Sequence, residues 1–76
     1  MDGFFINQKG TRLVTVGGVR MLTDFLPDEI TLVCVGANVT ITGEKLEILR
    51  FDANEIIIKG SIENVNTMKR ASRGIL

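Results

Sequence analysis

The stretch that decides the fold has two parts: residues 39–49 read VTITGEKLEIL, and residues 55–62 read EIIIKGSI. Apolar and polar side chains alternate through most of both parts, so that every second residue falls on the same face. Glycines interrupt the alternation at short intervals. A period of two with glycine breaks is typical of consecutive strands and not of a helix. We therefore predict an all-β protein.

The same pattern extends along the chain and predicts a series of short antiparallel strands. Turns are expected at 36–38, 43–44 and 52–54, where Gly, Asn or Asp can reverse the chain, and around Pro27. Gly60-Ser61 is expected to bend the strand that it interrupts. The predicted fold is a small meander or β-sandwich of six to eight short strands, at residues 4–7, 11–16, 19–25, 30–35, 39–42, 45–51, 55–59 and 62–65.

The composition fits one small domain with an aliphatic core. A chain of 76 residues buries only about 60% of the surface that it exposes when unfolded. Hydrophobic residues make up 45% of the sequence, but its only aromatic residues are four Phe, so the core must be Ile, Val and Leu. Two interpretations of the high apolar share stay open: a well-filled core, or an interface in a homo-oligomer.

Charge and residue usage argue against several kinds of site. Nine basic residues balance nine acidic ones, and histidine is absent. A neutral chain has no general attraction for nucleic acid, and without His there is no His-bound zinc or His-activated nucleophile. The single Cys34 cannot form an internal disulfide, and its apolar strand predicts a buried, inert thiol. We expect no enzyme, no catalytic residue, no cofactor, no metal and no small-molecule substrate.

The sequence also carries a prediction about the cell compartment. No apolar run approaches the roughly 20 residues that a spanning helix needs. The first residues lack the basic and then apolar pattern of a signal peptide. We expect a soluble protein that stays inside the cell.

One predicted strand, residues 30–35, has apolar side chains on both faces. It is therefore expected to be central in a sheet or covered by a partner chain. We predict that the protein pairs through exposed strand edges and an apolar face, with a homodimer favoured. The predicted edges are residues 11–16 and the strand that ends at Val65. The predicted interface residues are Leu13, Ile30, Leu32, Val33, Val35 and Ile62.

The end of the chain is basic. We place the β domain at residues 1–66 and a C-terminal tail at 67–76, expected to be disordered, with a short amphipathic helix as the alternative. Lys69, Arg70 and Arg73 are the candidates for contact with an anionic surface, although three charges near a membrane supply only about 1 kcal/mol each. A peripheral membrane adaptor is thus one alternative function. A small β-barrel that binds RNA is another alternative. Such proteins use stacking aromatics and a basic groove, whereas this chain has no Tyr, Trp or His and a balanced charge, so no nucleic acid is expected.

A set of motifs in a fixed order covers about three quarters of the chain. It reads GTRL at 10–13, VGGV at 16–19, ITL at 30–32, ITGEKLEI at 41–48 and IKGSI at 58–62, with Phe25 before an acidic turn. This set resembles the YabP/YqfC family of sporulation proteins, and the first motif and the basic end look more like YabP. Pro27 departs from the plain acidic turn of the family, so strand pairing there is expected to differ.

The resemblance implies a small β-sandwich made during sporulation of an endospore-forming bacterium. It also implies a role in the mother-cell cytoplasm or at the forespore surface, within the spore envelope. Members of the family are not known as enzymes, and no catalytic residue is carried over. We expect a non-enzymatic interaction or assembly module that forms a homo-oligomer, with a sporulation membrane protein as a further candidate partner.

Overall fold

The computed structural model describes residues 3–69, and over this range the chain forms six β-strands and no helix. The strands are β1 (Phe5–Lys9), β2 (Leu13–Gly17), β3 (Val19–Leu26), β4 (Glu29–Cys34), β5 (Ala37–Asp52) and β6 (Glu55–Lys69). All neighbouring strands are antiparallel. The prediction of an all-β antiparallel fold of six to eight strands is confirmed.

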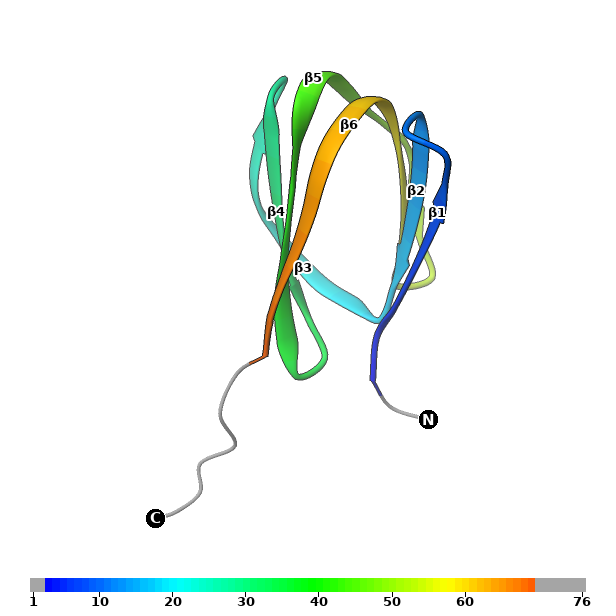
Figure 1. Cartoon of the computed structure of the whole chain (residues 1–76). Helices are drawn as coiled ribbons and strands as arrows, with labels where there is room; N and C mark the ends of the chain where they lie inside the picture. The colour runs from blue at the N-terminus through cyan, green and yellow to red at the C-terminus, as the bar shows by residue number, and fades with distance from the viewer. Residues whose placement is uncertain (1–2, 70–76) are drawn as a thin grey trace.

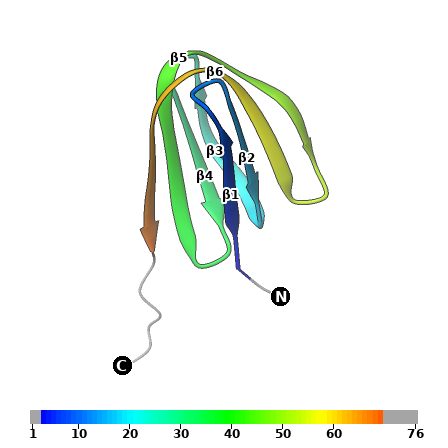
Figure 2. The same cartoon turned by 45° about the vertical axis from the view of Figure 1, so that its right-hand side comes forward.

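The strands form one sheet that is folded over on itself, in the order β1-β2-β6-β5-β4-β3. The two longest strands, β5 and β6, arch across the top of the molecule (Figure 1). Each contributes one half to each layer, as the turned view in Figure 2 also shows. The first layer contains β1, β2, the first half of β6 (55–59) and the second half of β5 (46–52). The second layer contains β3, β4, the first half of β5 (37–44) and the second half of β6 (61–69).

The bend in β5 takes the place of a predicted turn. The hairpin predicted at 43–44 is wrong, because β5 continues through these residues with shifts in its register against β6. Gly43 allows the close approach, since a Cβ atom there would lie 2.0 Å from the Ser61 carbonyl oxygen. The predicted bend at Gly60-Ser61 is confirmed, and Gly60 has a φ of 146° that other residues rarely adopt. Two long bent strands therefore replace four short ones.

The order of the strands is more than a simple meander. Strands β3 to β6 do follow one another, but the β1–β2 hairpin pairs with the far side of β6. The chain passes from β2 to β3 through Gly18 alone and thereby moves from one layer to the other. Gly18 has a φ of 76°, and a Cβ atom there would lie 2.4 Å from the Gly3 carbonyl oxygen. This crossing therefore requires glycine.

The hydrophobic core lies between the two layers and is aliphatic, as the composition predicts. Alternate residues of β2, β4 and the buried parts of β5 and β6 point inward, and each such side chain contributes about 1.5–3 kcal/mol when it is removed from water. Cys34 is fully buried among them, as predicted from its apolar strand. The core cluster consists of Val14, Val16, Val19, Ile30, Leu32, Cys34, Val39, Ile41, Leu46, Ile56, Ile58 and Ile62.

The turns of two hairpins hold the bends of the long strands in place. The turn between β3 and β4 accepts hydrogen bonds from the bend of β5, and the turn between β1 and β2 accepts them from the bend of β6. These bonds run from Gly43 N to Asp28 O (3.1 Å), Leu46 N to Pro27 O (2.8 Å), Gly60 N to Arg12 O (3.1 Å) and Ile62 N to Thr11 O (2.8 Å). Buried backbone groups that the bends would leave unpaired are satisfied in this way.

The ordered strand β6 extends beyond the boundary predicted for the domain. Ala37 pairs with Lys69, and Val39 pairs with Thr67, so residues 67–69 belong to the sheet. The predicted domain limit at 66 thus falls inside a strand. Residues 70–76, the rest of the predicted tail, lie outside the described residues.

Candidate interaction surface

Three of the predicted interface residues lie inside the chain's own core. Ile30 and Leu32 are 0% exposed and Ile62 is 4% exposed. The opposite layer of the same chain covers them, so their burial requires no second chain. The sequence pattern could not distinguish burial under the chain's own second layer from burial under a partner chain, because an apolar strand has the same composition in both cases.

The other three predicted interface residues are half-buried and do not form one patch. Leu13 lies on the outer face of the first layer, opposite Lys59 of β6. Val33 lies on the outer face of the second layer, opposite Asn38 of β5. Val35 follows β4 and donates its N–H to the Gly18 carbonyl oxygen at 2.9 Å. The predicted apolar face is therefore divided between two sides of the molecule.

The free strand edges also differ from those predicted. Strand β2, which corresponds to the predicted edge at 11–16, pairs with β1 on one side and with β6 on the other, so that prediction is wrong. The strand that ends at Val65 in the prediction is β6, whose second half pairs only with β5. Within residues 3–69, four strand edges have no ladder partner: those of β1, β3, the second half of β5 and the second half of β6.

Two of these edges lie beside each other and expose apolar side chains. Strand β3 and the second half of β5 are joined at both ends, by Val19 N to Asn54 O (3.0 Å) and Leu46 N to Pro27 O (2.8 Å). Both strands contain register shifts against their ladder partners, a device that discourages further pairing. The side chains of Met21, Phe25, Leu26, Leu49 and Phe51, here called the β3–β5 strip, are between 44% and 53% exposed.

The edge of β6 has a different character. Its pairing with β5 is regular from Asn64 to Lys69, without a register shift. Along residues 63–69 only Val65 is half-buried, and the other side chains are exposed and mostly polar. Glu63 lies at the register shift, between Asn64, which is opposite Thr42, and Ile62, which is opposite Gly43; Lys69 lies at the regular end of the segment. We call residues 63–69 the β6 edge.

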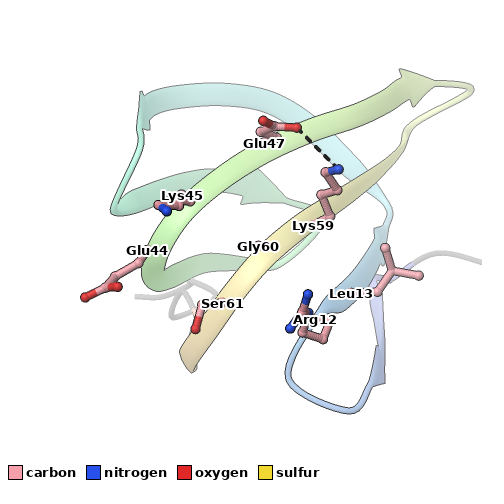
Figure 3. Close-up of a pocket in the computed structure, with 8 residues that line it drawn as sticks. All are labelled: Arg12, Leu13, Glu44, Lys45, Glu47, Lys59, Gly60 and Ser61. Atoms are coloured by element: carbon pink, nitrogen blue, oxygen red, sulfur yellow. Dashed lines mark ion pairs between the residues drawn. The ribbon is translucent and has the colours of Figure 1, made fainter.

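A hollow of about 600 Å³ lies at the bend of the two long strands (Figure 3). Residues from β2, β5, β6 and the turn before β2 line it. Lys59 Nζ lies 3.7 Å from Glu47 Oε1, and both side chains are more than half exposed. The charges around the hollow are of both signs, so they favour neither an anion nor a cation. The lining residues are Arg12, Leu13, Glu44, Lys45, Glu47, Lys59, Gly60 and Ser61.

The remaining predicted site residues are the three basic residues near the end of the chain. Lys69 is exposed at the end of β6, whereas Arg70 and Arg73 of the predicted basic contact lie outside the described residues. In the described part of the chain, no three His, Cys, Asp or Glu side chains are grouped so that they could hold a metal ion. Residues 3–69 also contain no helix with the length and apolarity to cross a membrane.

Comparisons with known proteins support the family resemblance. A search of curated proteins finds no match. The model of the YabP family, in contrast, matches residues 6–74, which include all six strands except the first residue of β1. Because this match covers nearly all of the 76 residues, the chain belongs to the YabP family, as its ordered motifs predict.

Proposed function

We propose that this protein is a non-enzymatic, sporulation-associated module that assembles with another chain through a free strand edge. Membership of the YabP family supports the connection with sporulation. A module of this kind needs a rigid scaffold and a segment of backbone that can accept a strand. The folded-over sheet supplies the scaffold, and the unpaired edges supply the backbone groups.

The observation that carries the proposal is the free side of the second half of β6. A strand edge presents a row of N–H and C=O groups that another strand can satisfy by hydrogen bonding. Many proteins protect such edges with register shifts, prolines or a covering segment. The β6 edge from Asn64 to Lys69 has none of these protections among the described residues.

We propose self-association as the first use of this edge, with a dimer favoured. A small domain has limited core area, so a partner that extends the sheet adds stability. A sporulation membrane protein is the further candidate partner. The proposed site of action is the mother-cell cytoplasm or the forespore surface. The non-enzymatic role rests on the sequence, which has no His, one Cys and no catalytic motif.

Two measurements test the proposal. A fluorescent fusion followed through sporulation is expected to outline the forespore, whereas equal diffuse signal in growing and sporulating cells would contradict the sporulation role. Light scattering at high micromolar concentration is expected to give a mass above that of the monomer. A strictly monomeric protein would contradict self-association and leave the localisation result to judge the rest.

A further inference from the structure

The regular part of the β6 edge differs from the other free edges in both pairing and charge. Strand β1 is only five residues long. Strand β3 and the second half of β5 contain register shifts, and each carries charges of both signs. From Asn64 to Lys69, in contrast, β6 has an unbroken ladder with β5 and no acidic residue. An incoming strand therefore meets a regular backbone here and charge of one sign.

The positive charge at the end of this segment is not neutralised by the residues around it. No acidic side chain within residues 3–69 forms an ion pair with Lys69. The part of β5 that lies opposite, residues 37–42, is uncharged. Arg70 and Arg73 follow in the sequence, outside the described residues, and chain length alone keeps their Cα atoms within about 14 Å of that of Lys69. An acidic residue on an incoming strand is therefore attracted to this end of β6.

The side chains of this segment alternate between two faces, and this alternation sets what a neighbouring strand meets. Three of them lie on the core side because they are opposite fully buried residues of β5: Val65 opposite Ile41, Thr67 opposite Val39, and Lys69 opposite Ala37. Val65 is half-buried, whereas Lys69 is exposed. A strand added along β6 places one side chain beside Val65 and another, four residues away on the same face, beside Lys69.

We propose that the β6 edge binds an extended acidic segment of another protein, antiparallel to β6, with an acidic residue opposite Lys69 and an apolar residue opposite Val65. This inference rests on the proposed function and names the chemistry of a partner chain. Antiparallel pairing continues the pattern of the sheet and is slightly more stable than parallel pairing. The acidic strand and a second copy of the chain compete for this edge, because both need the same backbone groups.

A six-residue peptide probes the edge. It has glutamate at its first position, valine at its fifth and threonine elsewhere, and its ends are acetylated and amidated. Paired antiparallel from Lys69 to Asn64, it places glutamate opposite Lys69 and valine opposite Val65, and threonine favours an extended backbone. In an NMR titration of the isotope-labelled protein, the peptide is expected to shift the amide signals of residues 64–69 and to leave those of β3 unchanged.

An exchange of charges tests the register. Lys69→Glu is expected to weaken the binding of this peptide about fivefold, because like charges then face each other. A second peptide with lysine in place of glutamate is expected to bind the Lys69→Glu variant as the first peptide binds the natural protein. Lys9→Glu is the matched control. It makes the same change in net charge beside the turn that contacts Ile62, at the other end of the β6 edge, and is expected to leave the affinity unchanged.

Backbone pairing is tested apart from charge by two N-methylated versions of the first peptide. The N–H groups of alternate residues in a strand point to opposite sides, so methylation at odd or at even positions blocks only one side. Strand pairing predicts that one version loses binding and the other keeps it. Simple attraction of an anion by basic side chains treats both versions alike, and equal binding would overturn the inference.

The remaining outcomes separate this inference from the proposed function. Peptide-induced shifts at the β3–β5 strip in place of residues 64–69, or no shifts at all, would overturn it. Failure of the lysine peptide to bind the Lys69→Glu variant would overturn the acidic residue opposite Lys69. If the peptide fails while the fluorescent fusion outlines the forespore, only this inference falls. If the peptide binds while the fusion is diffuse, the acidic strand on β6 stands and the sporulation role falls.

Discussion

The two halves of β6 differ in what lies beside them. Residues 55–59 pair with β2 on one side and β5 on the other, and Ile56 and Ile58 are fully buried. Residues 61–69 pair with β5 alone, and most of their side chains are polar and exposed. The same strand is thus central in one layer and an edge in the other. Composition follows the local neighbours and changes at the bend at Gly60.

Strand β5 shows the reverse arrangement with a different outcome. Its first half lies between β4 and β6, and Val39 and Ile41 are fully buried there. Its second half is an edge, but Leu49 and Phe51 on it are apolar and about half exposed. This edge lies beside β3, which exposes apolar side chains of its own. The two edges therefore suit different contacts: strand pairing at β6, and side-chain packing at the β3–β5 strip.

The largest expected effect comes from the central half of β6. Ile58→Ala removes a fully buried side chain and is expected to lower the free energy of unfolding by about 2–5 kcal/mol. Val65→Ala in the edge half, where Val65 only partly contacts the core, is expected to lower it by about 1 kcal/mol. Urea unfolding at low protein concentration measures both. Equal losses would show that the two halves do not differ in packing.

The bend itself is expected to be the next most sensitive place. Gly43→Ala puts a Cβ atom against backbone atoms of Ser61 and Ile62 and is expected to reduce stability by roughly 3 kcal/mol. Gly36→Ala is the control: nothing lies within 4 Å of its Cβ position, so only its left-handed φ of 79° opposes the change. That control is expected to lose about 1 kcal/mol. The prediction fails if the two variants unfold at the same urea concentration.

A smaller effect of opposite sign is expected at Lys45. This residue has a φ of 55° beside the bend of β5, a conformation that glycine adopts without strain. Lys45→Gly is expected to raise the free energy of unfolding by up to about 1 kcal/mol, partly offset by the freer unfolded chain. Lys45→Ala keeps the strain and is expected to give no gain. If alanine stabilises as much as glycine, the lysine side chain and not the backbone is the cause.

The smallest effect is expected on the outer face of the β6 edge. Asn64→Thr replaces an exposed side chain opposite Thr42 with one that suits a strand. The free energy of unfolding of the monomer is expected to change by less than about 0.5 kcal/mol. Thermal unfolding at low concentration measures it. A loss above 1 kcal/mol would mean that this half of β6 is packed more tightly than an open edge.

Much of the fold could be predicted from local pattern, but the surface could not. Alternation of apolar residues predicted the strands, and the turn at Pro27 and the bend at Gly60 are where expected. The turn predicted at Gly43 is instead a bend in β5, because glycine permits close backbone approach as readily as it permits a reversal. The turn predicted at 36–38 is observed at residues 35–36: Gly36 has a φ of 79°, and Ala37 and Asn38 already lie in β5.

The candidate interface shows the same limit. Ile30, Leu32 and Ile62 are buried in the core of the chain itself, and no sequence pattern could distinguish a core residue of this kind from one at an interface with another chain. Of the two predicted edges, the strand that ends at Val65 is an edge, because it corresponds to the second half of β6, which pairs only with β5. The loss of β2 as an edge could not be predicted, since β2 pairs with β6 some forty residues further along the chain.

The sequence by itself determined the class of the fold, its aliphatic core and its family, because these depend on the order and period of side chains along the chain. The tertiary structure decided which strands became neighbours, which edges stayed open and which apolar residues were covered. Those outcomes depend on contacts between distant residues and on two bends where the absence of a Cβ atom lets one backbone approach another.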